Sequence, residues 1–297
     1  MSQINIEFSA QEIISTLLQM QNDDGSWGNP ERFYTDKYKG TVWNILLLAE
    51  LHADGNVPRV KKACEFILSH SFEPGLGGFS TLYSKKTKSG LSSNVIPCLT
   101  GNMVFSLIRL GYLDDPRLQK SIEWIVSYQR MDDGIYEQPL EPGSLHLKAC
   151  FGSHTCFMGV VKALKALSEI PENRRTDQIK TKIQLLAEFI LKHHIYKKSH
   201  NLEEVSKPGW LRLGFPLMYQ TDILEILDIL TSINMKDDRM KEAIDIIQSK
   251  SINDTWILEN SYNGKMLVEI DEIGKPSQRI TEKAKRVLNA YWMGSKG

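Results

Sequence analysis

Three side chains of the types that zinc prefers could be brought together by the fold. They are Cys98, His154 and Cys156, and 56 residues separate Cys98 from His154. Thiolate sulfur and imidazole nitrogen bind zinc in tetrahedral sites, where an open position activates a bound thiol or water. The local run through His146, Cys150, His154 and Cys156 matches no zinc-finger spacing. The same residues therefore also fit a metal-free interior, with buried thiols and a histidine at a helix start.

Asp222 is the candidate for acid or base chemistry. It stands one turn into an apolar stretch, 215–233, that we expect to be an inner helix. Burial raises the pKa of a carboxyl group unless a cation or metal lies nearby. Three roles remain open for Asp222, namely catalytic general acid, metal ligand, or structural residue held by hydrogen bonds.

Aromatic residues supply the candidate wall of a binding cavity. Trp43, Phe157 and Tyr219 lie in apolar segments and could shape an apolar substrate and stabilise positive charge by cation–π contact. Aromatic residues at helical spacing also occur simply as core residues. Both interpretations place these rings inside the molecule.

A short sequence motif recurs between the segments that must position these residues. In this recurring phrase, a Gln is followed by acidic residues, a Gly and an aromatic residue. It runs from Gln21 to Trp27, returns from Gln129 to Tyr136, and is echoed at 75–79 and 253–256. Self-similarity at a period of roughly 50 to 60 residues is typical of repeat architectures. We expect its aromatic residues, Trp27, Tyr136 and Trp256, to be structural rather than catalytic.

The periodicity of apolar residues, together with the Gly, Pro and Asp residues that typically end or cap helices, predicts ten helices that pair into five hairpins. The predicted helices are 9–21, 40–53, 58–70, 97–111, 116–130, 154–169, 177–199, 215–233, 236–250 and 279–292. The segments at 40–53, 97–111, 154–169, 215–233 and 279–292 are predicted to be inner helices, and their partners to be outer helices with one charged face. The starts of the inner helices should converge on one end of a central cavity.

Composition excludes some classes of function. The 36 basic and 36 acidic residues give a net charge of zero, which argues against nucleic acid as a partner. No signal peptide is visible, and no apolar run reaches the roughly 20 residues that span a bilayer. We therefore expect a cytoplasmic protein with reduced cysteines. Transient contact with a membrane surface stays compatible with the sequence, and nothing in it marks a protein partner.

The chain resembles the α/α-toroid superfamily of squalene–hopene cyclases and protein prenyltransferase β subunits. The resemblance rests on the recurring phrase at 21–27 and on the regular spacing of the predicted inner helices, and it covers essentially the whole length. The segments 98–102, 154–164 and 214–218 also resemble short, single-toroid prokaryotic proteins labelled squalene cyclase-like. The resemblance implies an all-α fold, a ring of five to six helical hairpins, in one domain over 1–297.

The same resemblance implies roles for particular residues. Prenyltransferase β subunits hold zinc with an Asp, a Cys and a His at the starts of inner helices, and Cys98 and His154 match two of these positions. Ile96 stands where the Asp is expected, so the third zinc ligand would have to come from Cys156, Cys150, Asp222 or His146, and we take Cys156. Asn102 lies in one of the matching segments and joins the predicted substrate site. The loop residues Lys85, Lys86 and Lys88 correspond to a basic segment that meets a diphosphate, or form a plain solvated loop.

The acidic motifs of terpene synthases are missing. The chain has neither Asp-x-Asp-Asp, which protonates alkenes in class II cyclases, nor Asp-Asp-x-x-Asp, which holds magnesium and diphosphate in class I enzymes. Asp222 is then the predicted proton donor. We favour an enzyme that cyclises or transfers an isoprenoid or other long apolar substrate, assisted by zinc. A non-catalytic toroid that binds a lipid or a peptide is the alternative, and a scaffold subunit is a third.

Overall fold

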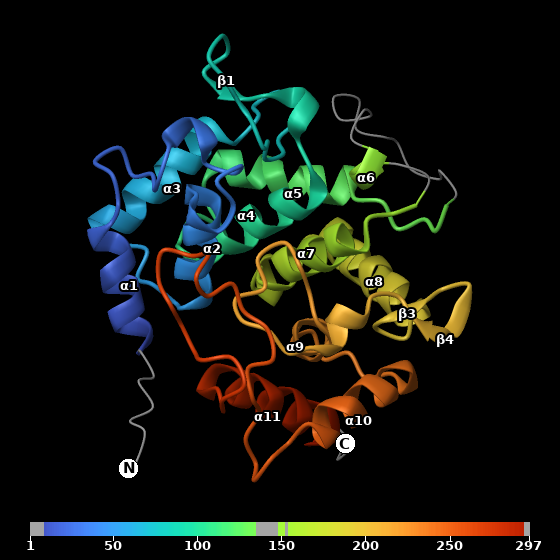
Figure 1. The fold of residues 1–297 in the computed structure, drawn as a ribbon. Coiled ribbons are helices and arrows are strands. Elements are labelled where there is room, and N and C mark those ends of the chain that lie inside the picture. Colours follow the sequence, from blue (N-terminus) through green and yellow to red (C-terminus); the bar gives the residue numbers. More distant parts are fainter. Residues whose placement is uncertain (1–8, 135–147, 152–153, 294–297) are drawn as a thin grey trace, which may run out of the picture.

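Helices form most of the described chain, which comprises residues 9–134, 148–151 and 154–293 of a computed structural model (Figure 1). Five of them follow one another in space, each packed against the next. They are α2 (Thr41–Glu50), α4 (Pro97–Arg109), α7 (Phe157–Ser168), α9 (Ile223–Ser232) and α11 (Gln278–Met293). This order matches the predicted inner helices, while closure of the row into a ring stays a prediction.

Outer helices pack against the inner helices that precede them in the chain. They are α3 (Pro58–His70), α5 (Pro116–Tyr128), α8 (Asp177–Lys192) and α10 (Lys241–Ser249). The chain enters through α1 (Ala10–Gln19), and a short α6 (Lys148–Phe151) precedes α7. The hairpin pairing predicted from the sequence is therefore present for four pairs within the described residues.

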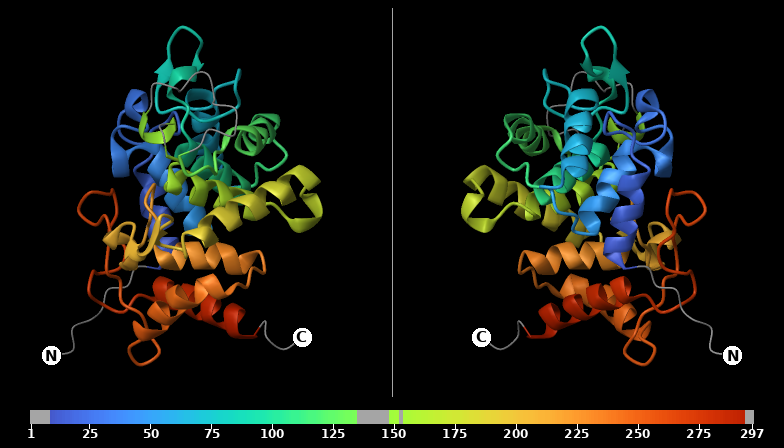
Figure 2. Two further views of the ribbon diagram at one scale, coloured as in Figure 1. Left: turned by 90° about the vertical axis from the view of Figure 1, so that its right-hand side faces the viewer. Right: turned by 90° about the vertical axis from the view of Figure 1, so that its left-hand side faces the viewer.

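Short strands and 3-10 turns fill the connections. Strands β1 (Tyr83–Ser84) and β2 (Ser89–Gly90) pair antiparallel, with Tyr83 opposite Gly90, in a hairpin that projects from the molecule (Figures 1 and 2). Strands β3 (Lys197–Lys198) and β4 (Asn201–Val205) form a second antiparallel hairpin with an irregular register. The 3-10 turns are Pro30–Arg32, Lys37–Lys39, Ser92–Asn94, Glu172–Arg174, Pro208–Leu211 and Asp238–Met240.

Burial separates the two classes of helix, as their sequences predict. Every residue of α2 from Thr41 to Ala49 is buried, whereas α10 buries only Ala243, Ile244 and Ile247. An apolar helix surrounded by other helices can be buried on all sides, and an outer helix needs only one apolar stripe. Helix α11 departs from the prediction, because it buries a single stripe and leaves its other face exposed.

The recurring phrase has a structural role. The indole N–H of Trp27 donates to the carbonyl of Leu17 at 2.8 Å, and that of Trp256 donates to the carbonyl of Ile247 at 2.7 Å. The Gln21 amide donates to the carbonyl oxygens of Gly25 and Arg59. The two indoles therefore bond to carbonyls in the last turns of α1 and α10, and Gln21 ties the turn at Gly25 to the start of α3. Tyr136 lies outside the described residues.

Several predicted helix boundaries are wrong. Helix α8 ends at Lys192 rather than residue 199, because His194 and Ile195 adopt positive φ angles of 42° and 73° that break the helix. Residues 215–222 are not helical, since Met218 has a φ of 51° and α9 begins only after Asp222. Helix α7 begins at Phe157 and not at 154.

Helices α4 and α7 approach each other most closely at Gly101. A Cβ atom at this position would lie 2.5 Å from the backbone carbonyl carbon of Lys162. Only glycine permits this separation of the two backbones. None of the helices in the described ranges is both long and apolar enough to cross a membrane.

Candidate functional site

The predicted metal ligands lie at the helix-start end of the inner helices. Cys98 is in the first turn of α4, Cys156 is the N-cap of α7, and Cys150 is in α6. Burial, followed by the nearby Cys156 and Cys150 thiols, raises the pKa of Cys98 well above its usual range. Burial and Cys156 raise the pKa of Cys150 to about 12. The structure thus brings three thiols into one neighbourhood.

His154 does not share this buried environment, because its side chain is exposed. Among the residues that the structure describes, no group of three or more His, Cys, Asp or Glu is placed to hold a metal ion. His146 lies outside those residues. Zinc coordination by Cys98, His154 and Cys156 therefore stays a prediction.

Aromatic rings gather at the same end. The Trp43 ring lies 5.9 Å from that of Tyr219 and 5.3 Å from that of Tyr34. Phe157 packs instead against Trp210, with ring centroids 4.8 Å apart. Asn102, buried in α4, donates to the carbonyl of Met218 at 3.1 Å, directly beside Tyr219. The structure brings Trp43, Tyr219 and Asn102 to one end of the molecule, where the rings pack on one another.

The three predicted diphosphate-binding lysines lie on the β1–β2 hairpin. Lys85, Lys86 and Lys88 are all exposed there, and Lys85 forms an ion pair with Glu31 at 2.5 Å. The hairpin projects away from the helices in every view (Figures 1 and 2). Nothing in this arrangement joins the three lysines to the aromatic cluster.

Asp222 is the N-cap of α9 and is 1% exposed. Its two carboxylate oxygens each accept a backbone N–H at 2.8 Å, one from Gly214 and one from Glu225. Burial raises the pKa of Asp222 to about 6, although both hydrogen bonds oppose that shift. The position predicted for Asp222, one turn inside the helix, is wrong. Its geometry is that of a capping residue with an unusually weak acidity.

A cavity of about 360 Å³ lies at the C-terminal ends of α2, α4 and α7, beside α9 and the first part of α11. Residues from the C-terminal ends of α2, α4 and α7 line it, together with α9, α11 and the start of α1. Its charged residues are five acids and five bases, namely Glu50, Glu169, Glu225, Asp228, Glu282, Arg109, Lys165, Arg279, Lys283 and Arg286. All five predicted inner helices therefore face one cavity, but its wall is strongly charged rather than apolar.

A buried ionic network forms the floor of this cavity. The Lys162 ammonium lies 2.7 and 2.8 Å from the two carboxylate oxygens of Glu225, and Lys165 lies 2.9 Å from the same carboxylate. Lys165 also pairs with Glu50 of α2. Burial alone would raise the pKa of Glu225, but the two lysines outweigh it and lower the pKa to about 2. The network joins α2, α7 and α9 by charge.

Other charged residues that line the cavity also form ion pairs. Arg109 pairs with Glu169 at 2.9 Å, and Arg286 pairs with Asp228 at 2.9 Å. Arg279 also lines the cavity and pairs with Asp271.

Lys283 differs from these bases. Within the described part of the chain, its half-buried ammonium forms no ion pair and no hydrogen bond. Its charge acts to lower the pKa of Glu50 and of Asp222, so carboxylates lie near it, but no described carboxylate lies within ion-pair distance and its N–H donors remain available to an anionic ligand.

The Phe105 ring provides an apolar surface between two cations. The Lys165 ammonium lies 4.2 Å from the ring centroid, and the Arg109 guanidinium carbon lies 4.5 Å from it. Leu51, Ile229 and Ile280 extend this apolar surface. The cavity therefore combines equal numbers of acidic and basic side chains with an apolar surface.

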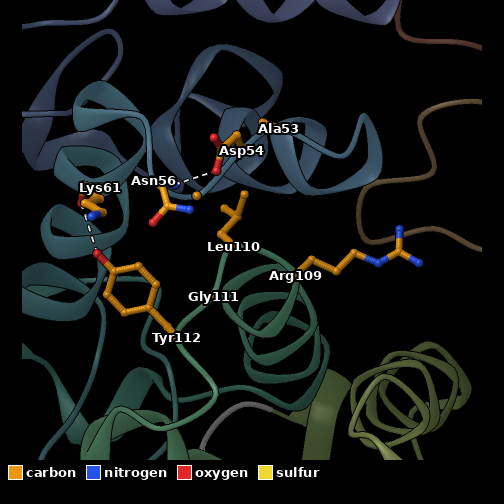
Figure 3. Close-up of a pocket in the computed structure, with 9 residues that line it drawn as sticks. Ala53, Asp54, Asn56, Lys61, Arg109, Leu110, Gly111 and Tyr112 are labelled. Atoms are coloured by element: carbon orange, nitrogen blue, oxygen red, sulfur yellow. Dashed lines mark hydrogen bonds between the residues drawn. The ribbon is translucent and has the colours of Figure 1, made fainter.

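A second cavity, of about 440 Å³, lies outside the inner helices between Ala53–Asn56 and Arg109–Tyr112 (Figure 3). Its polar groups bond mainly to one another. The carboxylate of Asp54 accepts the backbone N–H of Asn56 at 2.8 Å, and the Tyr112 hydroxyl donates to the carbonyl of Lys61 at 3.4 Å. Arg109 points away from these residues, as Figure 3 shows.

Sequence reasoning missed the ionic network. One signal was present, because Lys162 and Lys165 interrupt the otherwise apolar helix 154–169 at a spacing of three residues, which places both on one helix face. Glu225 similarly interrupts the apolar run of α9. The partner Glu50 is 115 residues from Lys165 and could not be assigned from spacing.

The chain matches no protein-family model and no curated protein sequence. Among solved structures, it is similar to a variant of the type II terpene cyclase MstE from Scytonema in the apo form. The TM-score is 0.37 and the sequence identity is 12%, with 95% of each chain covered. A likeness this weak transfers neither a fold nor an activity to the present chain.

Proposed function

We propose that the chain binds an amphiphilic anion, a short isoprenoid phosphate or diphosphate, in the central cavity. The observation that carries this proposal is the half-buried ammonium of Lys283, which lines the cavity and forms no hydrogen bond and no ion pair within 4 Å among the described residues. A phosphate beside Lys283 would accept hydrogen bonds that this ammonium does not make within the protein. Hydrogen bonds between ionised groups in a partly desolvated site are among the stronger polar contacts in proteins.

The rest of the wall suits the apolar part of such a ligand. Phe105, Leu51 and Ile229 present apolar surface to the cavity. The cations of Lys165 and Arg109 lie against the Phe105 ring. The volume of about 360 Å³ is at the lower end of the range for small-molecule sites. This size favours a short isoprenoid over the long apolar substrate expected from the sequence.

Calorimetric titration with geranyl diphosphate tests the proposal. The wild type should bind, and Lys283→Met should weaken binding by about tenfold or more, because the substitution removes the charge and retains most of the apolar stem. Lys285→Met is the matched control, since Lys285 is on the same helix, pairs with Asp254, and does not line the cavity.

Two further ligands separate the contributions of head and chain. Geraniol, which lacks the diphosphate, should bind much more weakly than geranyl diphosphate, and inorganic diphosphate should bind more weakly because it lacks the apolar chain. Equal affinities of wild type and Lys283→Met, or of geraniol and geranyl diphosphate, would contradict the proposal.

As a second candidate function, we propose that an alkene substrate takes a proton from Asp222, which is buried at the start of α9 and does not line the central cavity. The pKa of about 6 supports this role, because part of the Asp222 population then carries a proton near neutral pH. Product analysis with the wild type and Asp222→Asn is the test. Loss of turnover with retained binding would support catalysis by Asp222, and unchanged turnover would exclude it.

The zinc proposal from the sequence concerns the opposite end of the inner helices. Its support is the proximity of the Cys98 and Cys156 thiols, which lie at the starts of α4 and α7. Elemental analysis of purified protein should find one zinc per chain that disappears in Cys98→Ser. Protein without zinc, prepared in the presence of zinc salts, would rule the site out.

A further inference from the structure

A pocket of about 400 Å³ lies between two loops and shares no lining residue with the central cavity. We call it the loop pocket, and its polar side chains are those of Lys207, Trp210, Arg212, Gln220, Thr221, Asn260 and Tyr262. The first loop runs from 207 to 221, between β4 and α9, and the second is centred on Asn260. The two loops are far apart in the sequence and adjacent in space.

Backbone hydrogen bonds hold the two loops in register. The N–H of Phe215 donates to the carbonyl of Asn260 at 3.2 Å, and the N–H of Asn260 donates to the carbonyl of Leu213 at 3.1 Å. Asp222 fixes the end of the first loop through its bond to the N–H of Gly214. The pocket is therefore preorganised, which lowers the entropic cost of binding.

The side chains around the loop pocket have unused hydrogen-bonding capacity. Within the described ranges, the side-chain amides of Gln220 and Asn260 and the ammonium of Lys207 form no hydrogen bond or ion pair. Arg212 donates to the carbonyl of Glu259 at 2.8 Å. Trp210, at 2% exposure, lies beneath, and its indole N–H is buried without a partner. Buried polar groups normally have partners, so this one is an exception that needs an explanation.

The charges of the loop pocket define its ligand. Lys207 and Arg212 are both cationic, and no acidic residue lines the pocket. Two cations, two free amides and an aromatic floor complement a small organic anion that carries further hydrogen-bonding groups. We propose that the loop pocket binds such an anion, with a carboxylate or phosphate group held by Lys207 and Arg212 and its polar groups held by Gln220 and Asn260.

Indole N–H signals in ¹H–¹⁵N spectra test this proposal directly. The Trp210 signal is assigned by its disappearance in Trp210→Phe, and the protein is then titrated with citrate or inorganic phosphate at constant ionic strength. We expect a saturable shift of the Trp210 signal in the wild type. Lys207→Met combined with Arg212→Met should weaken the response about tenfold or more. Lys86→Met combined with Lys88→Met, on the exposed hairpin, is the matched control and should leave it unchanged.

Each outcome decides the proposal. Saturation by citrate at lower concentration than phosphate assigns the site to carboxylates, and the reverse assigns it to phosphates. A Trp210 signal that does not move with either anion, or that moves equally in the Lys207 and Arg212 double variant, overturns the proposal. Loss of the shift in Lys283→Met would also overturn it, because the anion would then act from the central cavity. Failure of geranyl diphosphate to bind leaves this test unaffected.

Discussion

Glu225 shows how a single residue determines the character of the central cavity. Its side chain is 2% exposed, and a lone carboxylate at that depth would be costly. Lys162 and Lys165 compensate by approaching it within 2.7 to 2.9 Å. Such a network contributes little net stability compared with apolar packing, but removing one partner leaves the others buried without compensation.

We therefore expect Glu225→Gln to destabilise the protein by about 3 to 5 kcal/mol, because two buried lysines lose their shared counter-charge. Chemical denaturation at neutral pH measures the change. Glu282→Gln, at an exposed position on the rim of the same cavity, should change the free energy of unfolding by less than about 0.5 kcal/mol. A loss in Glu225→Gln no greater than in the control would show that the network is not formed.

Asp222 gives a pH dependence of a definite sign. Its pKa is about 6 in the folded protein against an ordinary value of 3.8, so between these pH values the folded state holds a proton that the unfolded state releases. The stabilisation is complete below about pH 3.8 and is lost as the pH rises through 6. Relative to Asp222→Asn, the wild type should become less stable between pH 4 and 7, by about 3 kcal/mol if one pKa unit is worth about 1.4 kcal/mol.

Unfolding curves of both proteins across this pH range make the comparison. A difference between wild type and Asp222→Asn that stays constant from pH 4 to 7 would contradict the raised pKa of Asp222.

Individual site residues were partly predictable from the sequence. Trp43 and Tyr219 were expected at one end of the inner helices and lie together there, but neither lines the central cavity, and their role in substrate binding stays a prediction. The charged residues of the central cavity could not be grouped in advance, because each pair joins different helices. Lys162 and Glu225, for example, are 63 residues apart.

At the scale of elements, the helices were predictable and several of their ends were not. Apolar periodicity identifies α2, α4 and α7 because an inner helix must be apolar nearly all round. The start of α9 was misplaced because the apolar run beginning at Phe215 resembles a helix, although Asp222 is itself a typical N-cap residue. The end of α8 depends on Ile195 at a positive φ, which β-branched residues rarely adopt and sequence rules do not anticipate.

The close contact of α4 and α7 leads to a prediction for Gly101. Alanine at this position would place its Cβ atom 2.5 Å from the Lys162 backbone, and no side-chain rotation relieves a clash with backbone. Overpacking of this kind costs about 3 kcal/mol, while the better helix propensity of alanine returns about 1 kcal/mol. Gly101→Ala should therefore destabilise the protein by about 2 kcal/mol in thermal or chemical unfolding.

Gly209→Ala is the control for this experiment, because a Cβ atom at Gly209 meets nothing within 4 Å. It should leave the free energy of unfolding nearly unchanged. Equal stability of Gly101→Ala and the wild type would mean that α4 and α7 are further apart than the structure places them.

At the scale of the whole molecule, one arrangement of helices creates two different ends. The helix starts carry thiols and packed aromatic rings, and the opposite end carries a charged cavity of about 360 Å³. The sequence predicted that the helix starts would surround the binding site. The repeat pattern predicts which helices face inward but does not reveal at which end side chains leave a space, because that depends on the packing of all five helices.

Photolabelling tests the central claim, that an isoprenoid anion binds in the charged cavity. A geranyl diphosphate analogue with a diazirine on its apolar chain would be irradiated with the protein, and the labelled peptides identified by mass spectrometry. The account predicts labelling around Phe105 of α4 and Ile229 of α9, suppressed by excess geranyl diphosphate and reduced in Lys283→Met. Labelling confined to the helix-start end, around Cys98 and Tyr219, would contradict it.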